Sequence, residues 1–168
     1  TIIRQALENG YFNEFIFTDG LKAPEITDGV EQYLEGMYGT APTSMPGGRG
    51  PELFKEHYEK EFGEIPPKPY IDTSYDATFV LALAIEKAGS TEGPAIRDAI
   101  GEVLSEDGML VNINEWNKAK ELIAAGEKIR YEGASGPVLF NEVGDSMGAI
   151  GIWKIKDGDI VNESVEVQ

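Results

Sequence analysis

The chain has 168 residues, of which 14 are Lys or Arg and 30 are Asp or Glu, so its formal net charge is −16. Nucleic-acid binding is disfavoured, because the neutralisation of phosphates needs clustered Lys and Arg. The chain has no Cys and a single His, which excludes disulfides, Cys-ligated metals and thiol nucleophiles within it. With 41% hydrophobic residues, the sequence predicts a packed globule of one domain or two small ones.

The longest uninterrupted apolar run, Phe79–Ile85, is seven residues long. A helix that crosses a bilayer needs roughly 20 apolar residues, and this run is far shorter. The chain starts with Thr1 rather than Met. We therefore expect either a processed product or a piece of a longer protein.

The first part of the chain alternates between helical and extended patterns. Apolar residues recur at helical spacing before Asn9-Gly10, and a short apolar run ends at Asp19-Gly20. Pro24 suits the first turn of a helix, where its missing N–H costs nothing. In chain order we predict a helix over 2–7, a strand over 14–18, a helix start at 24, a strand over 34–40 and a connector over 41–50.

The rest of the chain reads first as helices and then as strands. Phe54, Tyr58 and Phe62 lie four residues apart, on one face of a helix that ends at Gly63. The pair Asp157-Gly158 is typical of a two-residue hairpin. In chain order we also predict helices over about 73–88 (capped at 72, 73 or 74 and stopped at 89), from about 94 and over 114–126, then strands over 137–140, 147–155 and 160–167. These elements predict an α/β fold with a C-terminal β-hairpin.

No catalytic or metal-binding motif stands out. Ser135 lies in a Gly-rich stretch that superficially suggests a nucleophile elbow, but the sole imidazole, His57, is expected on a solvated helix face. The acidic stretch Asn141–Asp145 lacks the spacing of a calcium loop and is interpreted as a turn. A hydrolase with paired carboxylates is the enzymatic alternative, but no pair is singled out by spacing. We expect no catalytic residue, no metal and no cofactor, and hence no enzyme.

Two side chains are candidates for ligand binding. Asp19 follows a predicted buried strand, at the strand end where open α/β sheets bind ligands, although a turn residue before Gly20 is the simpler interpretation. Tyr75 lies in the first turn of the long helix, where its ring could project from the helix end or pack in the core. A carboxylate together with a phenol suggests the capture of an ammonium group.

Six short motifs, in this order, resemble the C-terminal half of bacterial branched-chain amino-acid-binding proteins of ABC importers. The resemblance runs over essentially the whole chain and includes the predicted helix at Asn114–Trp116 and the final hairpin. The motifs are Ile3–Ala6, Phe17–Gly20, Leu34–Tyr38, Ser74–Ala77, Ala84–Ser90 and Tyr131–Val138.

The resemblance implies an incomplete type I periplasmic-binding-protein fold, in which two α/β lobes close on a ligand. Residues 1–42 and 147–168 would belong to the second, C-terminal lobe, and residues 43–146 to the first, N-terminal lobe. Family members are about twice as long as this chain. We therefore expect it to remain with a missing N-terminal half, to associate with itself, or to be a fragment of a larger molecule.

The resemblance also implies a function. Asp19 would bind the α-ammonium of an amino acid or a related small polar metabolite, Tyr75 would line the cleft, and Thr18 and Gly20 would be further ligand-binding residues. Many family members carry Glu where this chain has Asp19. The protein would deliver its ligand to an ABC permease from the periplasm or another extracytoplasmic location, with any leader absent from this chain. The alternative is a ligand-sensing module of the same fold in signalling or gene regulation.

Overall fold

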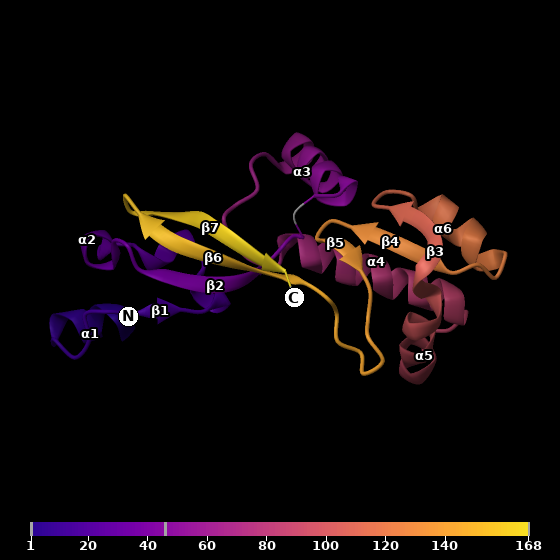
Figure 1. Cartoon of the computed structure of the whole chain (residues 1–168), viewed down its shortest axis with the longest axis horizontal. Helices are drawn as coiled ribbons and strands as arrows, with labels where there is room; N and C mark the ends of the chain where they lie inside the picture. The colour runs from indigo at the N-terminus through magenta and orange to yellow at the C-terminus, as the bar shows by residue number, and fades with distance from the viewer. Residues whose placement is uncertain (1, 46, 168) are drawn as a thin grey trace. The chain divides into compact units, whose positions relative to one another are not determined.

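The computed structural model describes residues 2–45 and 47–167. The chain divides into two compact units, whose elements are labelled in Figure 1. Unit 1 consists of Thr1–Thr43, Pro66–Pro69 and Ala149–Gln168. Unit 2 consists of Ser44–Ile65 and Tyr70–Gly148.

Unit 1 is built on a four-stranded sheet with the order β1-β2-β6-β7. The pair β1/β2 is parallel, whereas β2/β6 and β6/β7 are antiparallel. Its elements are α1 (Ile2–Glu8), β1 (Ile16–Phe17), the 3₁₀ helices η1 (Asp19–Leu21) and η2 (Pro24–Ile26), α2 (Glu31–Leu34), β2 (Tyr38–Thr43), β6 (Ala149–Lys156) and β7 (Asp159–Val167).

The core of unit 1 forms around Trp153, whose side chain is fully buried. Gly39 pairs with Phe17 on one side and with Trp153 on the other, and the two rings stack at a centroid distance of 5.7 Å. A Cβ atom at Gly39 would lie 2.6 Å from both the Phe17 carbonyl oxygen and the indole. The missing side chain of Gly39 therefore lets the two rings meet across β2.

Unit 2 is built on a three-stranded sheet with the order β3-β4-β5. The pair β3/β4 is parallel and β4/β5 is antiparallel. Helices α4, α5 and α6 contribute to one core with β3 and β4, which is centred on the fully buried Val111, Ile129 and Tyr131. The elements are α3 (Arg49–Phe62), α4 (Ile71–Ala88), α5 (Gly93–Val103), β3 (Leu104–Asn112), α6 (Trp116–Ala124), β4 (Ile129–Gly133) and β5 (Gly136–Val138).

Several predicted elements are confirmed. Helix α3 ends at Phe62 before Gly63, and α4 ends in the left-handed Gly89, which donates its N–H to the Ile85 carbonyl. The hairpin β6/β7 turns through Asp157 and Gly158, both with positive φ, as the Asp-Gly pair predicts. Thus caps and turn residues located these boundaries correctly.

Other boundaries differ from the prediction. The strand predicted over 34–40 is wrong in its first part, because α2 ends at Leu34 and β2 runs from Tyr38 to Thr43, into the predicted connector. The N-cap of α4 is Tyr70, in the left-handed conformation (φ 71°), rather than one of residues 72–74. Strand β3 was not predicted, because it follows α5 directly without a Gly or Pro between them.

Candidate ligand-binding site

The described part of unit 2 contains a cavity of about 540 Å³ at the carboxyl end of β3. This end of a parallel strand is where open α/β sheets bind ligands. Its walls come from α3, from the first turns of α4 and from the segment between β3 and α6. The lining residues are Phe54, His57, Tyr58, Lys60, Glu61, Phe62, Ile71, Tyr75, Ile113 and Asn114. We refer to this cavity as the aromatic pocket.

The start of α3 is fixed at the carboxyl end of β4. The backbone N–H of Arg49 donates to the Glu132 carboxylate at 2.7 Å, which satisfies one of the free N–H groups of the first turn. Gly50 lies against the carbonyl of Gly133, where a Cβ atom would clash. Glu132 pairs with Asn112, the last residue of β3. Helix α3 and the segment after β3 therefore meet at the same end of the sheet.

The rings of the pocket form a continuous aromatic wall. The Phe54 ring lies 5.8 Å from the Tyr58 ring and 5.4 Å from the Tyr75 ring, both tilted by just over 50°. Tyr58 in turn contacts Phe62, whose side chain is 74% exposed. Spacing by four residues on α3 thus creates a wall that is only partly covered by the rest of the described chain.

Asn114 forms the polar corner of the pocket. It has a positive φ of 63°, a conformation that Asn tolerates better than most residues, and its side chain reaches two pocket residues. The Tyr75 hydroxyl donates to Asn114 Oδ1 at 3.2 Å, and Asn114 Nδ2 lies within hydrogen-bond distance of His57 Nδ1. Burial raises the pKa of Tyr75, so the phenol keeps its proton and remains a donor.

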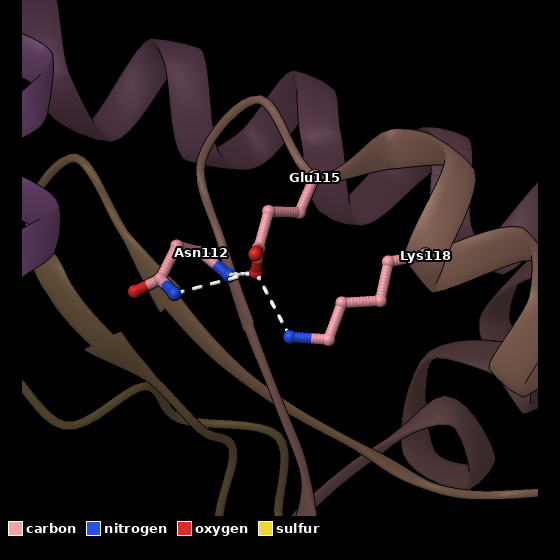
Figure 2. A network of polar contacts seen from close by, with 3 residues as sticks. All are labelled: Asn112, Glu115 and Lys118. Carbon is pink, nitrogen blue, oxygen red and sulfur yellow. Dashed lines mark hydrogen bonds and ion pairs between the residues drawn. The ribbon is translucent and has the colours of Figure 1, made fainter.

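A side-chain clamp holds the segment that carries Asn114 (Figure 2). Glu115 Oε2 accepts hydrogen bonds from the backbone N–H of Asn112 at 2.7 Å, from its side-chain amide at 3.3 Å and from Lys118 Nζ at 3.2 Å. The pKa of Glu115 lies below its ordinary value, mainly because the Asn112 N–H stabilises the carboxylate. The clamp closes the turn between β3 and α6, on which Asn114 lies.

Next to Tyr75, the buried Asp76 fixes the turn after β4. Its Oδ1 accepts from the Tyr131 hydroxyl at 2.9 Å and from the Ala134 N–H at 2.7 Å. Its Oδ2 accepts from the Ser135 N–H at 2.7 Å and from the Ser135 hydroxyl at 2.6 Å. Burial and the neighbouring carboxylate raise the pKa of Tyr131. Ser135 thus helps to fix the turn after β4 by donating twice to Asp76.

The other sequence-predicted residues lie in unit 1. Thr18, Asp19 and Gly20 follow β1 directly, and η1 begins at Asp19 with the Leu21 N–H donating to the Thr18 carbonyl at 3.0 Å. Asp19 is half-buried, whereas Thr18 and Gly20 are exposed. Gly20 lines a second cavity of about 710 Å³ together with the charged residues Arg4, Glu8, Glu25 and Asp28.

The structure thus places the predicted residues in two groups, Thr18, Asp19 and Gly20 in unit 1 and Tyr75 in unit 2. The partners of Tyr75 were missed, because a site at the end of β3 cannot be inferred when β3 itself is not predicted. His57 is exposed, as expected, and also contacts Asn114.

Among the described residues no group of three or more His, Cys, Asp or Glu side chains is placed to hold a metal ion. Within residues 2–45 and 47–167, no helix combines the length and apolar character of a membrane span.

Comparisons with known proteins identify the family and the fold of the chain. The family model described as "Receptor family ligand binding region" matches residues 1–158. The structure of the leucine-binding protein LivK from Thermotoga maritima is similar with a TM-score of 0.67 and 25% identity, over 98% of this chain and 40% of that one. The structure of the branched-chain amino acid transporter substrate-binding protein LivJ from Streptococcus pneumoniae, solved with isoleucine, is similar with a TM-score of 0.63 and 16% identity. The match covers 99% of this chain and 40% of LivJ.

A shorter match relates the chain to BasB of Halobacterium salinarum, the substrate-binding protein of a chemotactic signal transduction system. The two are 32% identical over 73 residues, which is 44% of this chain and 18% of BasB. The chain therefore spans well under half the length of these relatives. The resemblance inferred from sequence motifs and the α/β, type I periplasmic-binding fold are both confirmed.

Proposed function

Because this chain belongs to the receptor ligand-binding-region family, we propose that it is part of the substrate-binding component of an ABC importer that captures an amino acid. The observation that carries the proposal is the aromatic pocket at the carboxyl end of β3, lined by Tyr75. Support comes from LivK, which is a leucine-binding protein, and from LivJ, whose structure contains isoleucine.

We assign the two units to the two lobes of this architecture. Unit 1 contributes to the second lobe and carries the acid, Asp19, at the end of β1; unit 2 contributes to the first lobe and carries Tyr75. Asp19 binds the α-ammonium of the ligand through a charge-assisted hydrogen bond, and Thr18 and Gly20 supply the backbone beside it. Tyr75 contributes an aromatic wall. Ligand binding, without chemical conversion, is then the task of the protein.

Calorimetry on the full polypeptide that carries these 168 residues tests this function. Leucine, isoleucine or a related amino acid should bind with low-micromolar or tighter affinity. Asp19→Asn should weaken binding about thirtyfold, because a charge-assisted hydrogen bond is lost. Asp157→Asn, at the exposed hairpin turn, makes the same charge change and should leave the affinity unchanged. Equal affinities of the two variants would remove Asp19 from the site.

The match to BasB supports a second candidate, a ligand-sensing module in signalling. Both candidates share the ligand site and differ in the membrane partner, a permease in one case and a signal transducer in the other. Affinity purification from native membranes with the protein loaded with leucine separates them. Recovery of a permease and its ATPase supports import, and recovery of a transducer without them supports sensing.

We place the protein outside the cytoplasm, in the periplasm or an equivalent compartment, on the strength of the family. Protease added to intact cells with a permeable outer layer should degrade it while a cytoplasmic enzyme survives. Protection equal to that of the cytoplasmic enzyme would contradict this location.

We also propose that another stretch of polypeptide, either the rest of the same protein or a second copy, covers the β1 edge of the unit 1 sheet. Strand β1 is at that edge, and Ile16 on it is 73% exposed. Light scattering on the 168-residue chain alone should show association, and Ile16→Lys should reduce it. A monodisperse monomer with cooperative unfolding would contradict the proposal.

A further inference from the structure

Asn114 links the Tyr75 hydroxyl to ring nitrogen Nδ1 of His57, so the orientation of its amide is coupled to the tautomer of His57. In the amide orientation in which Asn114 Oδ1 accepts from the Tyr75 hydroxyl, Asn114 Nδ2 faces His57 Nδ1. Nδ1 therefore accepts, and in the neutral imidazole the proton sits on Nε2. His57 lines the aromatic pocket, and with Nδ1 next to Asn114, Nε2 is the ring nitrogen through which we expect His57 to contact a bound molecule. The second N–H of the Asn114 amide is a further hydrogen-bond donor for such a molecule.

The remaining lining residues are apolar or balance each other in charge. Phe54, Tyr58 and Tyr75 form the wall of rings, while Lys60 and Glu61 bring one positive and one negative side chain. The pocket thus matches a ligand group that is uncharged, large and apolar, with a hydrogen-bond acceptor at one end. Its volume of about 540 Å³ lies in the range of pockets that hold whole small molecules, so a ring fits as readily as a branched aliphatic group.

We infer that the aromatic pocket binds an aromatic ligand group with a polar end, such as a phenol, and that Asn114 determines this specificity by orienting His57 and Tyr75. The inference deepens the proposed function and rests on it, since Tyr75 belongs to both. The ring of the ligand lies on the wall of Phe54, Tyr58 and Tyr75, and its oxygen accepts from His57 Nε2–H. A site that donates to a ligand oxygen discriminates against the analogue that lacks it.

The test uses two probes without amino or carboxylate groups, p-cresol and toluene, so that the pocket is examined separately from Asp19. In NMR titrations of the full polypeptide, p-cresol should shift the side-chain amide of Asn114 and the ring of His57, and it should bind about five- to tenfold more tightly than toluene. Long-range proton–nitrogen spectra should show His57 as the Nε2–H tautomer. Shifts elsewhere, or equal affinity for both probes, would overturn the inference.

Asn114→Gly removes the amide and keeps the left-handed backbone, because Gly adopts positive φ without strain. The variant should lose the preference for p-cresol and should show both His57 tautomers. Asn117→Ala, at an exposed position of α6 outside the pocket, should change neither. An unchanged preference in Asn114→Gly would remove Asn114 from this role, even if p-cresol still binds.

Amino-acid titrations separate this inference from the proposed function. With L-tyrosine and L-leucine as ligands, the full polypeptide should favour L-tyrosine, and Asn114→Gly should abolish that preference. If no amino acid binds while p-cresol still shifts Asn114, the proposed function fails and the pocket assignment stands. If L-leucine binds as tightly as L-tyrosine in both proteins, the function stands and the specificity assignment fails.

Discussion

The carboxylate of Asp76 accepts two hydrogen bonds from Ser135, one from the backbone N–H at 2.7 Å and one from the hydroxyl at 2.6 Å. Tyr131 and Ala134 donate to the other oxygen, so four donors converge on one buried acid. This arrangement fixes the turn that follows β4, at the same sheet end as the aromatic pocket.

Asp76→Asn should destabilise the protein by about 2–4 kcal/mol. The amide that replaces one oxygen is itself a donor and cannot accept from the donors that face it, so buried N–H and O–H groups lose their partner. The urea midpoint of unfolding measures the effect. Asp98→Asn at an exposed site on α5 is the matched control and should shift stability by less than about 0.5 kcal/mol. Equal midpoints for the two variants would contradict the buried network.

Gly39→Ala should destabilise unit 1 by about 1–3 kcal/mol, because its Cβ atom would lie 2.6 Å from the indole of Trp153 and from the Phe17 carbonyl oxygen. Thermal unfolding followed by Trp fluorescence is the measurement. Gly101→Ala is the control: Gly101 lies in α5 with open space around its Cβ position, so Ala there should stabilise the helix by about 0.5–1 kcal/mol. The two substitutions should therefore have opposite signs.

The clamp at Glu115 should make stability depend on pH below the ordinary Glu range. The folded-state pKa of Glu115 lies below its ordinary value of 4.5. The contribution of the Glu115 carboxylate to stability is therefore fully present above pH 4.5 and is lost as the pH falls through the folded-state pKa. At pH 7, Glu115→Gln should lower the free energy of unfolding by less than about 1 kcal/mol, since the side chain is 37% exposed. Near pH 2, where the carboxyl group is protonated, the substitution should leave the free energy of unfolding unchanged. Urea unfolding across this pH range measures the difference.

Glu102→Gln, at an exposed site on α5, is the control for this pH experiment and should give the same difference from the wild type at both pH values. A constant difference for Glu115→Gln as well would show that the carboxylate does not act as a charged acceptor for Asn112.

The net charge of −16 should make stability rise with salt. Added KCl shortens the Debye length from about 30 Å at 0.01 M to about 3 Å at 1 M and so screens repulsion among the acids. Five ion pairs among the described residues are exposed, and each contributes at most about 1 kcal/mol to stability that salt could remove. The urea midpoint should therefore increase between 0.05 and 1 M KCl.

Replacing four exposed acids by Lys halves the net charge, and this variant tests whether repulsion among the acids causes the dependence on salt. The positions are Glu56, Glu64, Glu102 and Glu127. The variant should show a clearly smaller dependence on KCl than the wild type. The same slope for both proteins would indicate that KCl acts through hydrophobic burial instead.

Much of the fold was predictable because local signals were strong. Six motifs indicate the family, and the C-terminal ends of α3 and α4 and the turn of the β6/β7 hairpin follow from Gly63, Gly89 and the Asp-Gly pair. Strand β3 was missed for a physical reason. It carries a register shift between Leu104 and Met109 and exposed acids in between, so its burial pattern does not alternate regularly.

The missed strand also explains which part of the site could not be predicted. Tyr75 was found because it lies in a strongly helical segment, and its role in ligand binding remains a prediction together with that of Asp19. Asn114 could be placed only with coordinates, since neither its positive φ nor the Glu115 clamp has a sequence signature. A contact between residues 57 and 114 depends on tertiary packing, which spacing along the chain does not encode.

The short segment Pro66–Pro69 belongs to unit 1, where Lys68 donates to Glu25 at 3.1 Å, although the residues on both sides of it belong to unit 2. Together with the junctions at Thr43/Ser44 and Gly148/Ala149, the backbone changes unit four times. A protease that nicks any single junction therefore cannot release either half of the molecule. Neither unit can be produced as one uninterrupted gene fragment, and dissecting them requires circular permutation or co-expressed pieces.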